Sequence, residues 1–301
     1  MIELLELVTQ PWSETFMQRA FLVGAAAAVA CAVVGTFVVL RGMAFIGDAV
    51  AHAVFPGVAI GFVLQISLVL GGLVTGILTA IAIFFASRSR RLSEDSAIGV
   101  FFAFSFALGI VVVSTQQAYT GDLTSFLFGQ ILGVSDDDVL MVLIVGATLV
   151  ALTLAVQRRL VTVTLDRETA AALGLRVARW DLLVYLLVTI AIVISLQAVG
   201  NILVLALLIT PAAAARLVTD RLGVMMAIAA AIGAVSAIVG LYLSYYYNLA
   251  AGGLIVMVLT AAFLACWAGR TLRAARWWAP AAALPEEPDE QLLAGSLGRV
   301  P

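Results

Sequence analysis

The sequence predicts an all-α fold, a polytopic transmembrane helical bundle of about eight to nine spans with a short cytoplasmic helix. Of the 301 residues, 63% are hydrophobic and only 11% are charged. The mean hydropathy is +1.14, and apolar runs of about 20 residues recur along the chain. A soluble domain carries roughly 25% charged residues, so most of these helices would lack a polar face for water. We therefore expect a multi-pass protein of the cell membrane.

The apolar runs define nine candidate spans, each long enough to cross a hydrocarbon core of about 30 Å as a helix. They lack the alternation of polar and apolar residues that is typical of a β-barrel. The spans cover residues 17–40, 43–66, 69–87, 97–114, 138–156, 180–199, 201–218, 223–246 and 252–270. We expect an interfacial N-terminal segment at 1–15, a transmembrane domain at 16–278, and a disordered tail at 279–301, which is acidic and contains proline.

Arginines mark one side of the membrane. They cluster at 88–91, 158–179, 216–221 and 270–276. Because short cytoplasmic loops retain basic residues, we place these loops and the C-terminus in the cytoplasm. Residues 114–138 contain no basic residue and end in three aspartates, as expected for an external loop. Arg19 is the one basic residue against this trend.

The composition also excludes several kinds of chemistry. All 16 basic residues are arginine, so the chain has no P-loop lysine and no Schiff-base lysine. If ATP drives the protein, another chain must hydrolyse it, and we expect no enzymatic activity of its own. Cys31 and Cys266 lie in separate apolar runs, which excludes a disulfide framework and a thiolate metal cluster.

One pair of ionisable residues lies inside a predicted span. Asp48 and His52, the only histidine, are four residues apart and share one helix face. Inserting an aspartate at the centre of a membrane span costs about 2.5–3.5 kcal/mol, so Asp48 should face a pathway or a partner. Carboxylate with imidazole suits Mn²⁺, Fe²⁺ or Zn²⁺ without choosing among them. Two copies on a twofold axis would supply four ligands. The alternative is a pair that only hydrogen-bonds to neighbouring helices.

Two prolines interrupt the spans. Pro56, followed by Gly57, should bend or break the helix after His52 and free the His52 carbonyl. Pro211 removes the hydrogen-bond donor to Leu207. We predict helix breaks near the pathway at Pro56, Gly57 and Pro211.

Several segments, in order, resemble the manganese/zinc (ABC-3 type) ABC transporter permease subunits. They are GDAVAHAVFPG (47–57), SEDSAIGVFFA (93–103), GDLTSFLFGQIL (121–132), DRETAAALGL (166–175) and VGNILVLALLITPAAAAR (199–216). The likeness covers roughly residues 16–270. It implies that Asp48 and His52 are the metal-binding residues of the translocation pathway. The chain departs from the family pattern at Ala51 and Ala250.

The segment DRETAAALGL lies in the most basic loop and predicts a short helix that begins near Asp166 and stops at Gly174. The resemblance implies that it is the coupling helix that docks on the ATPase. Without the resemblance, an ordinary loop helix explains it equally well. The coupling residues implied are Asp166, Arg167, Glu168, Ala170, Ala171, Leu173, Gly174 and Leu175.

We therefore expect a homodimeric permease that moves a divalent metal ion inward. The resemblance implies a cytoplasmic ABC ATPase and an extracytoplasmic metal-binding protein as partners, with the metal ion as substrate and no permanent cofactor. One alternative is a proton-coupled secondary transporter, in which Asp48 and His52 relay protons. Another is an ABC permease for a metal chelate or vitamin. An intramembrane enzyme would need a nucleophile motif, which the sequence lacks.

Overall fold

The computed structural model describes residues 9–88, 91–114 and 129–277, which form helices and no strand. Nine of these helices are long and apolar enough to cross a membrane, which confirms the predicted spans. The nine are α2 (Thr15–Arg41), α3 (Ala44–Val63), α4 (Leu68–Ser87), α5 (Glu94–Ser114), α7 (Asp136–Leu165), α9 (Val177–Val199), α10 (Asn201–Val218), α11 (Leu222–Tyr247) and α12 (Ala251–Trp277). A 3₁₀ turn, η2 (Ile131–Gly133), and the short helix α8 (Arg167–Ala172) complete the described fold.

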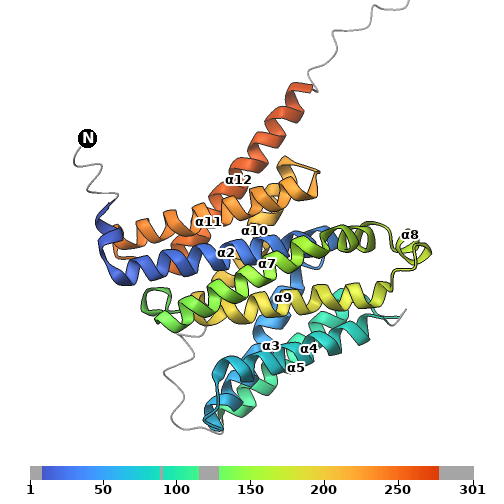
Figure 1. Ribbon diagram of the computed structural model, residues 1–301, viewed down its shortest axis with the longest axis horizontal. Coiled ribbons are helices and arrows are strands. Elements are labelled where there is room, and N and C mark those ends of the chain that lie inside the picture. The colour runs from blue at the N-terminus through green and yellow to red at the C-terminus, as the bar shows by residue number, and fades with distance from the viewer. Residues whose placement is uncertain (1–8, 89–90, 115–128, 278–301) are drawn as a thin grey trace, which may run out of the picture.

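Helix α2 forms the centre of the bundle. It packs against α7, α9, α10 and α11, and its sequence of alanine, valine and glycine lets these neighbours approach closely. Figure 1 shows α3, α4 and α5 grouped on one side of α2, α7 and α9, and α11 and α12 on the other. The group formed by α3, α4 and α5 is joined to the rest mainly through contacts of α4 and α3 with α9, and also through contacts of α3 with α10.

The contact between α3 and α4 depends on two glycines. A β-carbon at Gly57 would lie 2.1 Å from the carbonyl oxygen of Gly71, and one at Gly71 would lie 2.2 Å from the carbonyl oxygen of Gly57. Both distances are too short for any side chain, so the two backbones touch here. The close approach fixes α4 against the half of α3 that follows His52.

The predicted breaks at Pro56, Gly57 and Pro211 are wrong, because both helices continue through these residues. Helix α3 continues from Ala44 to Val63 with Pro56 inside it, and α10 continues from Asn201 to Val218 with Pro211 inside it. Each proline removes one backbone hydrogen bond, but both prolines are buried in the bundle and each helix continues past its proline. Gly57 therefore serves the α3–α4 contact within a continuous helix.

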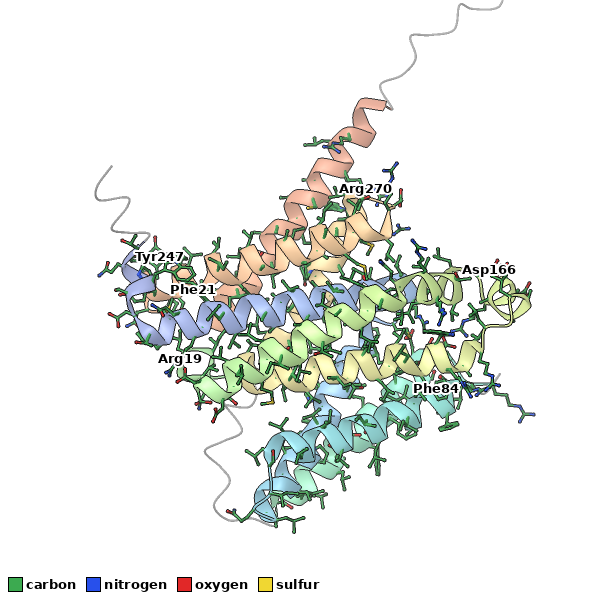
Figure 2. The ribbon with its side chains drawn as sticks, in the orientation of Figure 1. Arg19, Phe21, Phe84, Asp166, Tyr247 and Arg270 are labelled. Atoms are coloured by element: carbon green, nitrogen blue, oxygen red, sulfur yellow. The ribbon has the colours of Figure 1, made fainter. Side chains whose placement is uncertain are left out.

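Labelled residues identify the two ends of the bundle. Figure 2 shows Arg19 and Tyr247 at one end and Asp166 and Phe84 at the other. The arginine-rich segment around α8 lies at the second end (Figure 1). Arg19, the basic residue against the predicted trend, pairs with Asp136 of α7 at 2.7 Å. Its charge is thus balanced by the acidic start of α7.

The described part of the N-terminal segment packs on the bundle. Trp12 stacks on Phe21 of α2 with 4.8 Å between ring centroids, and its indole Nε1 donates to the hydroxyl of Tyr242 in α11. Aromatic side chains of this kind are typical of the membrane–water interface. The predicted tail at 279–301 lies outside the described residues.

Candidate metal site

Asp48 and His52 face each other across one turn of α3, as their spacing predicts. Asp48 Oδ1 lies 3.5 Å from His52 Nε2. The His52 side chain is 18% exposed and the Asp48 side chain 42% exposed, so the aspartate forms the open edge of the site. Within the described parts of the chain, no group of three or more His, Cys, Asp or Glu side chains comes together. One protomer therefore offers this pair rather than a full shell of ionisable ligands.

Two phenylalanines of α5 hold the imidazole. The rings of Phe102 and Phe106 meet the His52 ring at nearly right angles, with centroids 5.0 and 5.1 Å away. The two phenylalanine rings are parallel to each other within 4°. They restrict rotation of the imidazole and leave its Nε2 edge directed toward Asp48.

Asn201 is a third polar residue at this site, and the sequence analysis did not select it. Its side chain is buried, at 2% exposure, and its Nδ2 lies 3.4 Å from His52 Nε2. Its Oδ1 is buried and has no hydrogen-bond partner. An asparagine that opens an apolar helix was the available signal, but its partner lies 149 positions earlier in the chain. Residue spacing could not reveal that contact.

A glycine places Asn201 at the site. Gly200 has φ 81° and ψ 164°, a backbone conformation that is essentially restricted to glycine. It ends α9 and starts α10, with Asn201 as the first helical residue. The backbone of Gly129 packs on this turn, because a β-carbon there would lie 2.4 Å from the Val199 carbonyl carbon. The Gly129 backbone therefore holds the turn in place.

The predicted loop helix is present as α8. The Asp166 carboxylate caps it by accepting a hydrogen bond from the Thr169 backbone N–H at 2.9 Å. The hydrogen bond from the Thr169 hydroxyl lowers the pKa of Asp166 below its usual value. The helix ends at Gly174 with φ 78°, and Leu175 N–H bonds to the Ala170 carbonyl at 3.0 Å. Gly174 N–H also bonds to the Ala171 carbonyl at 3.0 Å. The two bonds make a Schellman motif, with its glycine at the stop that the sequence predicts.

Only part of the segment 166–175 is exposed and free to meet another protein. Ala170 is fully buried, whereas Leu173 is 68% exposed. Arg167, Glu168 and Ala171 are exposed as well. An exposed leucine on a polar loop is an apolar contact point without a partner inside the described chain.

A buried ion pair lies beneath this segment. Arg41 Nη1, at the end of α2, is 2.8 Å from Asp181 Oδ1 of α9, and their side chains are 5% and 12% exposed. Arg41 Nε also donates to the Thr164 hydroxyl of α7 at 3.1 Å. Arg167 of α8 reaches the second oxygen of Asp181 at 3.6 Å. These contacts connect α8 to the end of α2 that leads into α3.

A bundle of membrane spans with an Asp–His pair on one span and a short polar helix at one end is typical of a membrane transport protein. The chain belongs to the ABC 3 transport family, whose sequence profile matches residues 13–269. It is the membrane permease of an ABC transporter, the subunit without the ATPase domain. Membership in this family excludes the proton-coupled secondary carrier.

Relatives are similar over most of the chain. The manganese transport system membrane protein MntC of Halalkalibacterium halodurans is 41% identical over 83% of this chain and 86% of its own length. The chelated iron transport system membrane protein YfeC of Yersinia pestis is 38% identical over 87% and 88%. A chain in the structure of PsaBC from Streptococcus pneumoniae in complex with Fab is 35% identical, with a TM-score of 0.78 over 89% of this chain and 95% of that one.

Proposed function

We propose that this permease carries a divalent metal ion, Mn²⁺, Fe²⁺ or Zn²⁺, into the cytoplasm as part of an ABC importer. The proposal rests on one observation: a carboxylate and an imidazole, 3.5 Å apart, on a membrane-spanning helix of a family member. This donor pair suits these three ions. Relatives named for manganese and for chelated iron transport support the same class of substrate.

The functional unit of the proposal is a homodimer. The Asp48 side chain is 42% exposed in one chain, and a carboxylate on a membrane span does not face lipid. A second copy that covers this edge would remove the exposure. It would also bring a second Asp–His pair to the ion, because one pair is too few ligands for a divalent cation.

The cytoplasmic ATPase is proposed to dock on α8 and its flanks, residues 166–175. Leu173 supplies the exposed apolar contact, and the arginines around α8 support a cytoplasmic position for this end and for the C-terminus. Closure of the ATPase then reaches the metal helix along the contacts of Arg167 and Arg41 with Asp181.

In the proposed cycle, an extracytoplasmic metal-binding protein releases the ion to Asp48 and His52. Ligation needs a deprotonated carboxylate and a neutral imidazole, and the phenylalanine rings keep His52 in place. ATP-driven movement of α8 then opens the site toward the cytoplasm. Alternating access of this kind requires no covalent step in the permease.

The test is metal analysis of the purified full-length chain beside Asp48→Ala and His52→Ala. We expect both variants to lose bound metal and metal uptake while they keep membrane insertion and ATPase assembly. Metal content equal to wild type in both variants would refute the metal pair. A chelate permease would instead retain uptake of the chelate in both variants.

A further inference from the structure

We propose that Asn201 is a metal ligand, so that each protomer contributes three donors and the dimer contributes six. The inference deepens the proposed function and rests on it. The set of Asp48, His52 and Asn201 from two chains supplies four oxygens and two nitrogens. A shell of six such donors favours Mn²⁺ or Fe²⁺ over Zn²⁺.

The spacing of the three side chains fits one ion. Asp48 Oδ1 lies 3.5 Å and the Asn201 amide 3.4 Å from the same atom, His52 Nε2. Two ligands that each lie about 2.1 Å from a metal are about 3.4 Å apart at a tetrahedral angle and about 3.0 Å apart at an octahedral one. The two distances to His52 are therefore those of neighbouring ligands in one coordination shell.

The oxygen of Asn201 is available for the ion. Asn201 is 98% buried, given its 2% exposure, yet its Oδ1 has no hydrogen-bond partner. A buried acceptor without a partner is costly, and such an atom calls for a ligand. The two ends of an asparagine amide have nearly the same shape. Rotation of the amide about χ2 places Oδ1 beside His52 Nε2, where it can face the cation.

The backbone around Asn201 is held in a fixed position. Gly200 holds a conformation that other residues rarely adopt (φ 81°, ψ 164°), and the Gly129 backbone packs against the turn. Ligands on rigid elements keep the geometry that discriminates between metals. A flexible turn would let the amide leave the ion and would abolish selectivity.

The donor count decides the preference among ions. Zn²⁺ is satisfied by four ligands, which two Asp–His pairs already provide. Mn²⁺ prefers an octahedral shell rich in oxygen, which needs the two amides as well. Loss of Asn201 should therefore weaken Mn²⁺ binding more than Zn²⁺ binding.

The experiment compares Mn²⁺ and Zn²⁺ binding to the full-length chain in lipid nanodiscs, measured separately by equilibrium dialysis and mass spectrometry of bound metal. We expect Asn201→Val to weaken Mn²⁺ binding by about tenfold to a hundredfold and Zn²⁺ binding by less than about threefold. Asn201→Asp keeps an oxygen donor and should retain Mn²⁺ binding. The matched control is Ile202→Ala, at the next position of α10 and 51% exposed, which should bind both ions as wild type does.

Two results would overturn the assignment of Asn201 as a ligand and leave the proposed function standing, provided that Asp48→Ala abolishes metal binding in the same assay. One is unchanged Mn²⁺ binding in Asn201→Val. The other is an equal loss for both ions, which would mean that Asn201 only orients His52. If wild type binds neither ion, or if Asp48→Ala binds both normally, the proposed function and this inference are both refuted.

Discussion

The buried pair of Arg41 and Asp181 gives a prediction that can be worked out from distances and exposure. The replacement Asp181→Asn removes the negative charge 2.8 Å from a guanidinium that is only 5% exposed. Leaving a buried charge without its partner costs about 3–5 kcal/mol. Arg167 is 3.6 Å from Asp181 and 61% exposed, so the loss of that second contact adds at most about 1 kcal/mol.

The assay is reversible unfolding of the purified full-length chain by a denaturing detergent, followed by circular dichroism. We expect Asp181→Asn to lower the free energy of unfolding by about 3–5 kcal/mol. The double variant Arg41→Met with Asp181→Leu should recover most of this loss, because it removes both charges and keeps apolar volume.

A matched control is Asp220→Asn. Asp220 pairs with Arg216 at 2.9 Å, but the two side chains are 94% and 44% exposed, so the expected loss is below about 1 kcal/mol. The reasoning fails if Asp181→Asn costs no more than this control. It also fails if the change in the free energy of unfolding of the Arg41→Met, Asp181→Leu double variant equals the sum of the changes for its two single replacements.

Three further outcomes are expected. Gly57→Val should destabilise the purified chain by roughly 2 kcal/mol or more, because a β-carbon at this position would lie 2.1 Å from the Gly71 carbonyl oxygen. Gly99→Ala is the control, because Gly99 faces open space and its replacement should not destabilise the chain. Equal thermal stability of both variants would contradict the contact. Leu173→Asp should weaken ATPase binding in a pull-down titration at unchanged stability, since the side chain is 68% exposed; wild-type affinity would argue against docking there. Metal affinity should rise from about pH 5 to about pH 7 in the dialysis assay, because His52 must be neutral to ligate; a flat profile would count against imidazole ligation.

The local sequence predicts most of the helices correctly, but not all of their lengths. The fifth span was expected to end at residue 156, whereas α7 extends from Asp136 to Leu165. The membrane sets the length of an apolar run, but a helix continues into water until a capping residue stops it. Here that residue is Asp166, which starts α8.

The two prolines show that local sequence rules can also predict a helix break where the helix continues. Pro56 and Pro211 each remove a hydrogen bond, and sequence reasoning treats that loss as a break. Both prolines are buried and both helices continue; beside Pro56, the contact of Gly57 with Gly71 holds the backbone. Local rules cannot include that support, since it comes from another helix.

The sequence by itself determined the membrane class, about eight to nine spans, the facing pair of Asp48 and His52, and the stop after α8 at Gly174. Each depends on hydropathy or on spacing within one helix, which short-range geometry fixes. Only the tertiary structure decided that Asn201 meets His52, 149 positions away, and that Asp181 is a buried partner of Arg41. Such contacts depend on how helices cross, and the apolar surfaces that drive the crossing do not specify which polar side chains will meet.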